Sequence, residues 1–231
     1  MTAARRPISL LKTVGILLAK DLLIEWRTRA RLNALVFFAL ATLLLFSFAV
    51  GDTRMLARNA GGYLWLALLF ASVLALGESF RVEQENLTLD GLRLAPADAR
   101  AIFLSKAVGN SVLLVGLGAV LVPVMVALYG VQVTMGLGPL AGTVVLGCMA
   151  ISAPGTLYSA IASNARARDV LLPLLLFPLI IPALLASAKA TTLVLQGDPM
   201  EQLRSWFGLL AGFNLIYWGL GFVLFPRVIE D

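Results

Sequence analysis

The chain has 231 residues, of which 60% are hydrophobic and 13% charged, and its mean hydropathy is +0.92. Soluble domains carry about a quarter charged residues, so this composition excludes an ordinary soluble fold and indicates a membrane protein. The net charge of +5 does not indicate a nucleic-acid-binding protein, because most Lys and Arg residues stand between apolar segments, where charges set membrane topology.

The first 31 residues predict an amphipathic helix that lies along the membrane surface. Charges at Lys20, Asp21 and Glu25 interrupt its apolar stretch, which is not typical of a secretory signal peptide. On a helical wheel the apolar face consists of Ile8, Leu11, Gly15, Leu18, Leu22 and Trp26. The basic face consists of Lys12, Lys20, Arg27 and Arg31. Such a basic face is expected to meet anionic headgroups. The helix is either a simple anchor or an elbow that braces the first span, and the wheel does not distinguish the two.

The rest of the chain, residues 32–231, predicts one all-α transmembrane domain. A membrane-crossing helix needs roughly 20 apolar residues, and six segments reach that length: 32–50, 60–77, 107–128, 139–162, 170–188 and 206–225. The segments are continuously apolar rather than alternating, which favours helices over a β-barrel.

The distribution of basic residues predicts the orientation. Of the 18 Lys and Arg residues, 14 lie in residues 1–31, 78–106, 163–169 and 226–231, and the other four are Arg54, Arg58, Lys189 and Arg204. Positive residues concentrate on the cytoplasmic side. Both termini are therefore expected in the cytoplasm.

The predicted spans contain no Asp, Glu, Lys or Arg in their cores, and the chain has no histidine. Proton- and ion-driven transporters usually place such groups within the membrane, and histidine is the commonest metal ligand and general base. The sequence also lacks the GxxxxGK[ST] loop that binds ATP phosphates. We therefore expect no catalytic residue, no metal site and no cofactor in this chain, and any energy would come from a partner. The lone Cys148 is expected to be buried.

Prolines concentrate in the predicted fourth and fifth spans. The fifth span contains Pro173, Pro178 and Pro182, and Pro154 and Gly155 are adjacent in the fourth. Each proline removes a backbone donor and crowds the preceding turn. The fifth span is therefore expected to be kinked, or broken into a re-entrant piece, and to move during function. Pro154 and Gly155 are expected to mark a conformational bend as well, where two subunits, or substrate and subunit, meet.

A polar segment of unusual length, residues 78–106, separates the second and third spans. Between Glu78 and Arg100 it holds five acids and three arginines, interleaved with leucines, and Asp98 is placed to cap a helix that leads into the third span. The segment is either a docking surface for a basic partner or a solvated connector on the headgroups. Its acidic charge argues against the connector, because an anionic leaflet would repel it.

The pattern E-x-F-R-x-E-x-E-N-x-x-L-D-x-L-R-L-x-P, from Glu78 to Pro96, resembles the cytoplasmic loop of the CcmB family, the membrane subunit of the cytochrome c maturation ABC transporter. The stretches LLAKDLLIEWRTRARLNALVFF and SAPGTLYSAIASNARARDVLLPLLLFPLIIP are similar to that family as well. The resemblance implies six spans of the ABC-2 exporter type in the inner membrane, an N-terminal elbow helix, and a loop that docks onto a separate ATPase. The contact residues implied are Glu83, Glu85, Leu87, Asp90, Leu92 and Pro96.

The resemblance also implies partners. These are a CcmA-like ATPase that holds ATP and Mg²⁺, CcmC-like and CcmD-like membrane proteins, and a CcmE-like haem chaperone, with a homodimer and membrane lipids as further contacts. Haem would be a transported or partner-held ligand, although the absence of histidine fits poorly with direct haem ligation by this chain. Two alternatives stay open: an ABC-2 permease for a lipid, glycan or drug, and a membrane scaffold with no ATPase.

Overall fold

The computed structural model describes residues 10–79, 98–163 and 168–230, and these residues form helices and their connections, without a strand. The order is α1 (Leu10–Thr28), α2 (Ala30–Ala49), α3 (Thr53–Arg58), α4 (Ala60–Glu78), α7 (Ala99–Tyr129), α8 (Leu137–Ser163), α9 (Arg168–Gln196) and α10 (Leu203–Glu230). Helices α2, α4, α7, α8, α9 and α10 are long and apolar enough to cross a membrane. The prediction of an all-α protein with six spans is therefore confirmed.

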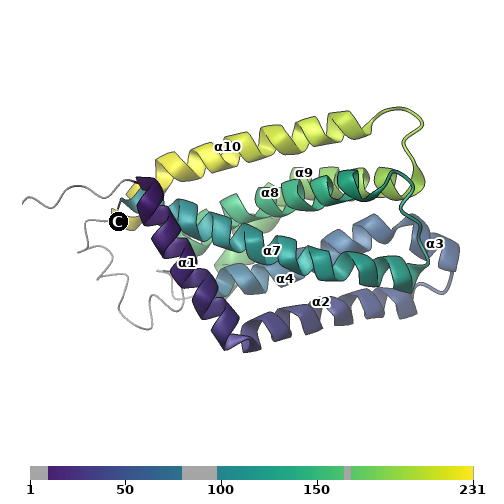
Figure 1. The fold of residues 1–231 in the computed structure, drawn as a ribbon, viewed down its shortest axis with the longest axis horizontal. Helices are drawn as coiled ribbons and strands as arrows, with labels where there is room; N and C mark the ends of the chain where they lie inside the picture. Colours follow the sequence, from purple (N-terminus) through teal and green to yellow (C-terminus); the bar gives the residue numbers. More distant parts are fainter. Residues whose placement is uncertain (1–9, 80–97, 164–167, 231) are drawn as a thin grey trace, which may run out of the picture.

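The long helices lie side by side in one bundle, and α1 runs obliquely across one end of it (Figure 1). The C-terminal end of α10 lies at the same end as α1, and α3 lies at the opposite end (Figure 1). Within the bundle α4 and α8 are the most buried spans, whereas α2 and α10 form its two edges and are buried over only 17% of their apolar windows.

Helices α7, α9 and α10 are clearly longer than the spans that hydropathy predicts. Helix α7 begins at Ala99 rather than 107, because the Asp98 carboxylate accepts a hydrogen bond of 2.9 Å from the Arg100 backbone N–H and caps the helix in its polar part. This confirms the predicted cap. The helix ends at Tyr129 and is capped by Gly130, whose φ of 63° is the left-handed conformation that glycine supplies most easily. Helix α9 continues to Gln196 rather than 188.

The fifth span is an unbroken helix. Helix α9 passes through Pro173, Pro178 and Pro182 without interruption, so the expected break into a re-entrant piece is wrong. Pro178 and Pro182 are exposed on the outside of the bundle, where the missing backbone donors do not disturb a helix–helix contact, and Pro173 is half-buried.

The central helix α8 is tied to its neighbours by hydroxyl groups. Ser152 Oγ donates to the Ala107 carbonyl of α7 at 2.6 Å, and Ser159 Oγ donates to the Leu76 carbonyl of α4 at 2.6 Å. Gly155 allows the close approach to α4, since a Cβ atom there would stand 2.4 Å from a methyl carbon of Leu76. The adjacent Pro154 and Gly155 thus lie in a buried helix contact, where the small glycine is required.

Candidate functional site

The C-terminal end of α4 is held by side chains from three other helices. The last carbonyl groups of a helix lack partners within it, and here they accept hydrogen bonds from elsewhere. The Arg31 guanidinium of α2 donates to the Ala75 carbonyl, and the Lys106 ammonium of α7 donates to the Ser79 carbonyl at 3.0 Å. With the bond from α8 to Leu76, the end of α4 is attached to α2, α7 and α8.

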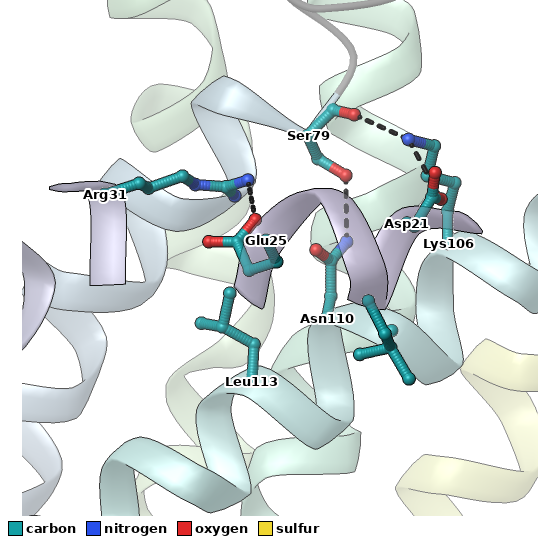
Figure 2. A pocket seen from close by; sticks show the side chains of 9 residues that line it. Asp21, Glu25, Arg31, Ser79, Lys106, Asn110 and Leu113 are labelled. Atoms are coloured by element: carbon teal, nitrogen blue, oxygen red, sulfur yellow. Dashed lines mark hydrogen bonds and ion pairs between the residues drawn. The ribbon is translucent and has the colours of Figure 1, made fainter. Parts of the chain in front are cut away.

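Both cations are paired with acids of α1. Asp21 and Glu25 are four residues apart, so they project from the same face of α1. Asp21 Oδ2 lies 3.2 Å from Lys106 Nζ, and Glu25 Oε2 lies 2.8 Å from Arg31 Nη1 (Figure 2). We call Asp21, Glu25, Arg31 and Lys106 the α4 clamp. Through it, α1 is bound to the end of α4 at two points.

The α4 clamp is largely shielded from solvent. Its side chains are exposed by only 19% for Asp21, 17% for Glu25, 25% for Arg31 and 12% for Lys106. A charge removed from water is costly unless it is paired and hydrogen-bonded. Each charge of the clamp is paired, but Glu25 Oε1 and Arg31 Nε are buried without a hydrogen-bond partner among the described residues. The two cations also lie at the negative end of the α4 dipole, which favours positive charge. The arrangement therefore holds the end of α4 in one position.

A polar contact extends the α4 clamp to α8. Asn110 Nδ2 of α7 donates to Ser79 Oγ at 3.2 Å (Figure 2) and to Thr156 Oγ1 of α8 at 2.9 Å. Ser79 and Asn110 line, with the clamp residues, a small cavity of about 50 Å³. Within the described part of the chain no group of three or more His, Cys, Asp or Glu residues is placed to hold a metal ion. The contacts of this site are ion pairs and hydrogen bonds that join α1, α2, α7 and α8 to the end of α4.

The predicted docking residues lie outside the described residues. Glu83, Glu85, Leu87, Asp90, Leu92 and Pro96 all belong to residues 80–97. The α4 clamp nevertheless marks where that segment begins and ends, because Ser79 is the last described residue before it and Lys106 lies in the second turn of α7 after Asp98. The candidate site is thus the root of the predicted loop.

The predicted basic face divides between two helices. Lys12, Lys20 and Arg27 are exposed on α1, and Lys20 also pairs with Asp21 at 3.2 Å. Arg31 is a correction: the chain bends at Arg29, whose φ is 28°, so Arg31 lies in the first turn of α2 and points into the α4 clamp. Asp21, Glu25 and Lys106 had no predicted role in a site. The sequence did contain one indication of such a contact, because two acids stand four residues apart on a helix that is otherwise basic and apolar.

The chain is similar to known proteins over most of its length. A family model described as "CcmB protein" matches residues 12–226. A protein of Pseudomonas aeruginosa named "Heme exporter protein B" is 31% identical over 203 residues, which are 87% of this chain and 90% of the relative. Proteins of the same name from Rhodobacter capsulatus and Bradyrhizobium diazoefficiens are 32% and 28% identical, and the matches cover 86% and 88% of this chain and 89% and 90% of the relatives.

Proposed function

The chain belongs to the CcmB protein family, and on that premise we propose that it is the membrane subunit of an ABC transporter in cytochrome c maturation. A separate ATPase subunit binds and hydrolyses ATP, and the membrane subunit couples this hydrolysis to haem delivery or to release of a haem-loaded chaperone. The names of the relatives, "Heme exporter protein B", support haem as the ligand of the complex.

The observation that carries the coupling proposal is the attachment of the α4 end to α2, α7 and α8 and, through the α4 clamp, to α1. Residues 80–97 follow this end directly, and their sequence is acidic and rich in leucine, which suits docking onto a basic groove of the ATPase. A displacement of the docked loop pulls on Ser79. Because Ser79 is bonded to Lys106 and Asn110, the displacement moves α7 with α4 and reaches α1 through Asp21.

The proposed function also implies a membrane and an orientation for the protein. It lies in the inner membrane with α1 and the loop root on the cytoplasmic side, where the basic residues concentrate. Helix α1 acts as an elbow at that surface. CcmC-like and CcmD-like membrane proteins and a CcmE-like chaperone complete the complex, and ATP with Mg²⁺ stays on the ATPase.

Co-purification with the ATPase tests the proposal. The complex is isolated in mild detergent from cells that produce the wild-type chain, and bound proteins and pigment are identified by mass spectrometry. We expect a subunit with an ATP-binding GxxxxGK[ST] motif to remain bound. The double variant Glu83→Lys/Asp90→Lys should lose it, because lysines repel a basic docking groove. Glu201→Lys, which reverses an exposed charge near the start of α10 at the opposite end of the bundle, is the control and should retain it.

A wild-type chain that is stable alone and retains no ATPase would contradict the proposal. Equal retention by the double variant would contradict the docking assignment while leaving the ATPase partnership intact.

A further inference from the structure

A groove of about 360 Å³ lies between α2 and α7, under the last turns of α1. Its walls are apolar and include Leu35 and Val36 of α2 and Val112, Gly116 and Val120 of α7. From Val112 to Val120 it follows α7 for about 12 Å, at 1.5 Å per residue. Both valines are exposed, by 48% and 43%. In a membrane such a surface meets acyl chains.

The groove has a polar, positively charged mouth. Trp26 of α1 lines it and is 69% exposed, as tryptophans at the headgroup level of a membrane are. The exposed Arg29 guanidinium lies 5.7 Å above the Trp26 ring. Glu25 also lines the groove, but its charge is compensated by Arg31. Arg29, beside Trp26, therefore adds a positive charge at the mouth.

A second apolar groove lacks this feature. It measures about 440 Å³, lies between α7 and α8, and is lined by residues such as Val122, Pro123 and Leu140, with no charged side chain among its described lining. It offers an acyl chain an apolar wall but offers a headgroup nothing to bind. The two grooves therefore differ in what they can select.

We propose that the groove between α2 and α7 binds one anionic phospholipid. One acyl chain lies along Val112, Gly116 and Val120, and the phosphate headgroup lies beside Trp26 and Arg29. Juxtamembrane arginines attract anionic headgroups, and the apolar walls exclude a free phosphate ion as the ligand. The lipid fills the space under α1. This site is independent of the ATPase coupling proposed above.

Gly116 provides the test. A Cβ atom at Gly116 would meet nothing within 4 Å, and a leucine at this position is expected to occupy the groove that Gly116 lines. Gly208→Leu on α10, where a Cβ atom also meets nothing within 4 Å, is the matched control outside the groove. Arg29→Gln tests the headgroup contact. The chains are reconstituted in vesicles of phosphatidylglycerol and phosphatidylcholine with identical acyl chains, extracted, and examined by native mass spectrometry.

The wild-type chain and Gly208→Leu should each retain one phosphatidylglycerol in preference to phosphatidylcholine. Gly116→Leu should reduce this retention at least tenfold, and Arg29→Gln should abolish the preference between the two lipids. If Gly116→Leu does not fold, Gly116→Ala is used and should reduce retention several-fold. Retention of the two lipids in the proportions of the vesicle by the wild-type chain, or unchanged retention by the folded Gly116 variant, would overturn the proposal.

Discussion

The contribution of the α4 clamp to stability can be measured most directly by replacing Lys106. The substitution Lys106→Met keeps a long unbranched side chain but removes the charge. It eliminates the ion pair with Asp21 and the hydrogen bond to the Ser79 carbonyl. We expect the variant to insert and fold but to be clearly less stable.

The magnitude follows from burial. Removing one partner of a buried ion pair destabilises a protein by about 3–5 kcal/mol, because the other charge is left without compensation. Lys106 is 12% exposed and Asp21 19% exposed, but Asp21 keeps its contact with Lys20. We therefore expect about 3 kcal/mol, near the lower end of that range. For a chain of this size the unfolding temperature falls by about 2–4 °C per kcal/mol, which corresponds to roughly 6–12 °C.

The assay is thermal unfolding of the purified chain in detergent, followed by intrinsic tryptophan fluorescence. Lys189→Met is the matched control, because Lys189 is a lysine exposed on α9, and its removal should change the unfolding temperature by less than about 2 °C. The cycle with Asp21→Asn measures the pair itself. Since the two side chains are in contact, the double variant should lose at least about 1 kcal/mol less than the sum of the single variants. Additive losses, or a Lys106→Met shift no larger than the control, would refute the attachment of α1 to the end of α4.

Two further predictions concern α8 and α9. Gly155→Ala should destabilise the chain by about 1–3 kcal/mol, because the added methyl group overlaps Leu76 of α4. Gly212→Ala, at a position with open space, is the control and should leave the stability unchanged. Equal unfolding temperatures for the two variants would show that α8 does not need this close approach. Pro178→Ala should restore a backbone donor in the exposed part of α9 and reduce cytochrome c yield in cells while the amount of protein in the membrane stays normal. A normal cytochrome c yield would argue against a moving role for α9.

The sequence predicts the spans well because hydropathy records the cost of placing polar groups in lipid. It predicts helix ends only where a local signal exists, as at Asp98, which caps α7. The end of α9 at Gln196 also has a local signal, since Gly197, with φ of 97°, and Pro199 follow it, but the predicted span stopped at the charged Lys189. The short helix α3, capped by Asp52, was missed because six residues are too few for a periodic pattern.

The α4 clamp could not be predicted because it depends on tertiary contacts. Asp21, Arg31 and Lys106 belong to three different helices, and from the sequence each looks like an interfacial charge. Only the bend at Arg29 moves Arg31 off the basic face of α1. The importance of Gly155 was only partly visible, because the adjacent proline suggested a bend, whereas the structure shows a close contact with Leu76.

The hydroxyl contacts of α8 have a consequence for biogenesis. Translation delivers α4 and α7 to the bilayer before α8, and the carbonyl groups that accept from Ser152 and Ser159 belong to those earlier helices. When the fourth span enters the membrane, the carbonyl groups that accept its hydrogen bonds are therefore already present. Its serine hydroxyls need not remain without a partner in lipid, where each unpaired polar group is costly. The last span follows the same order, since Asn214 and Trp218 donate to carbonyl groups of α8. A permuted gene that made α8 first would send its serines into the bilayer alone.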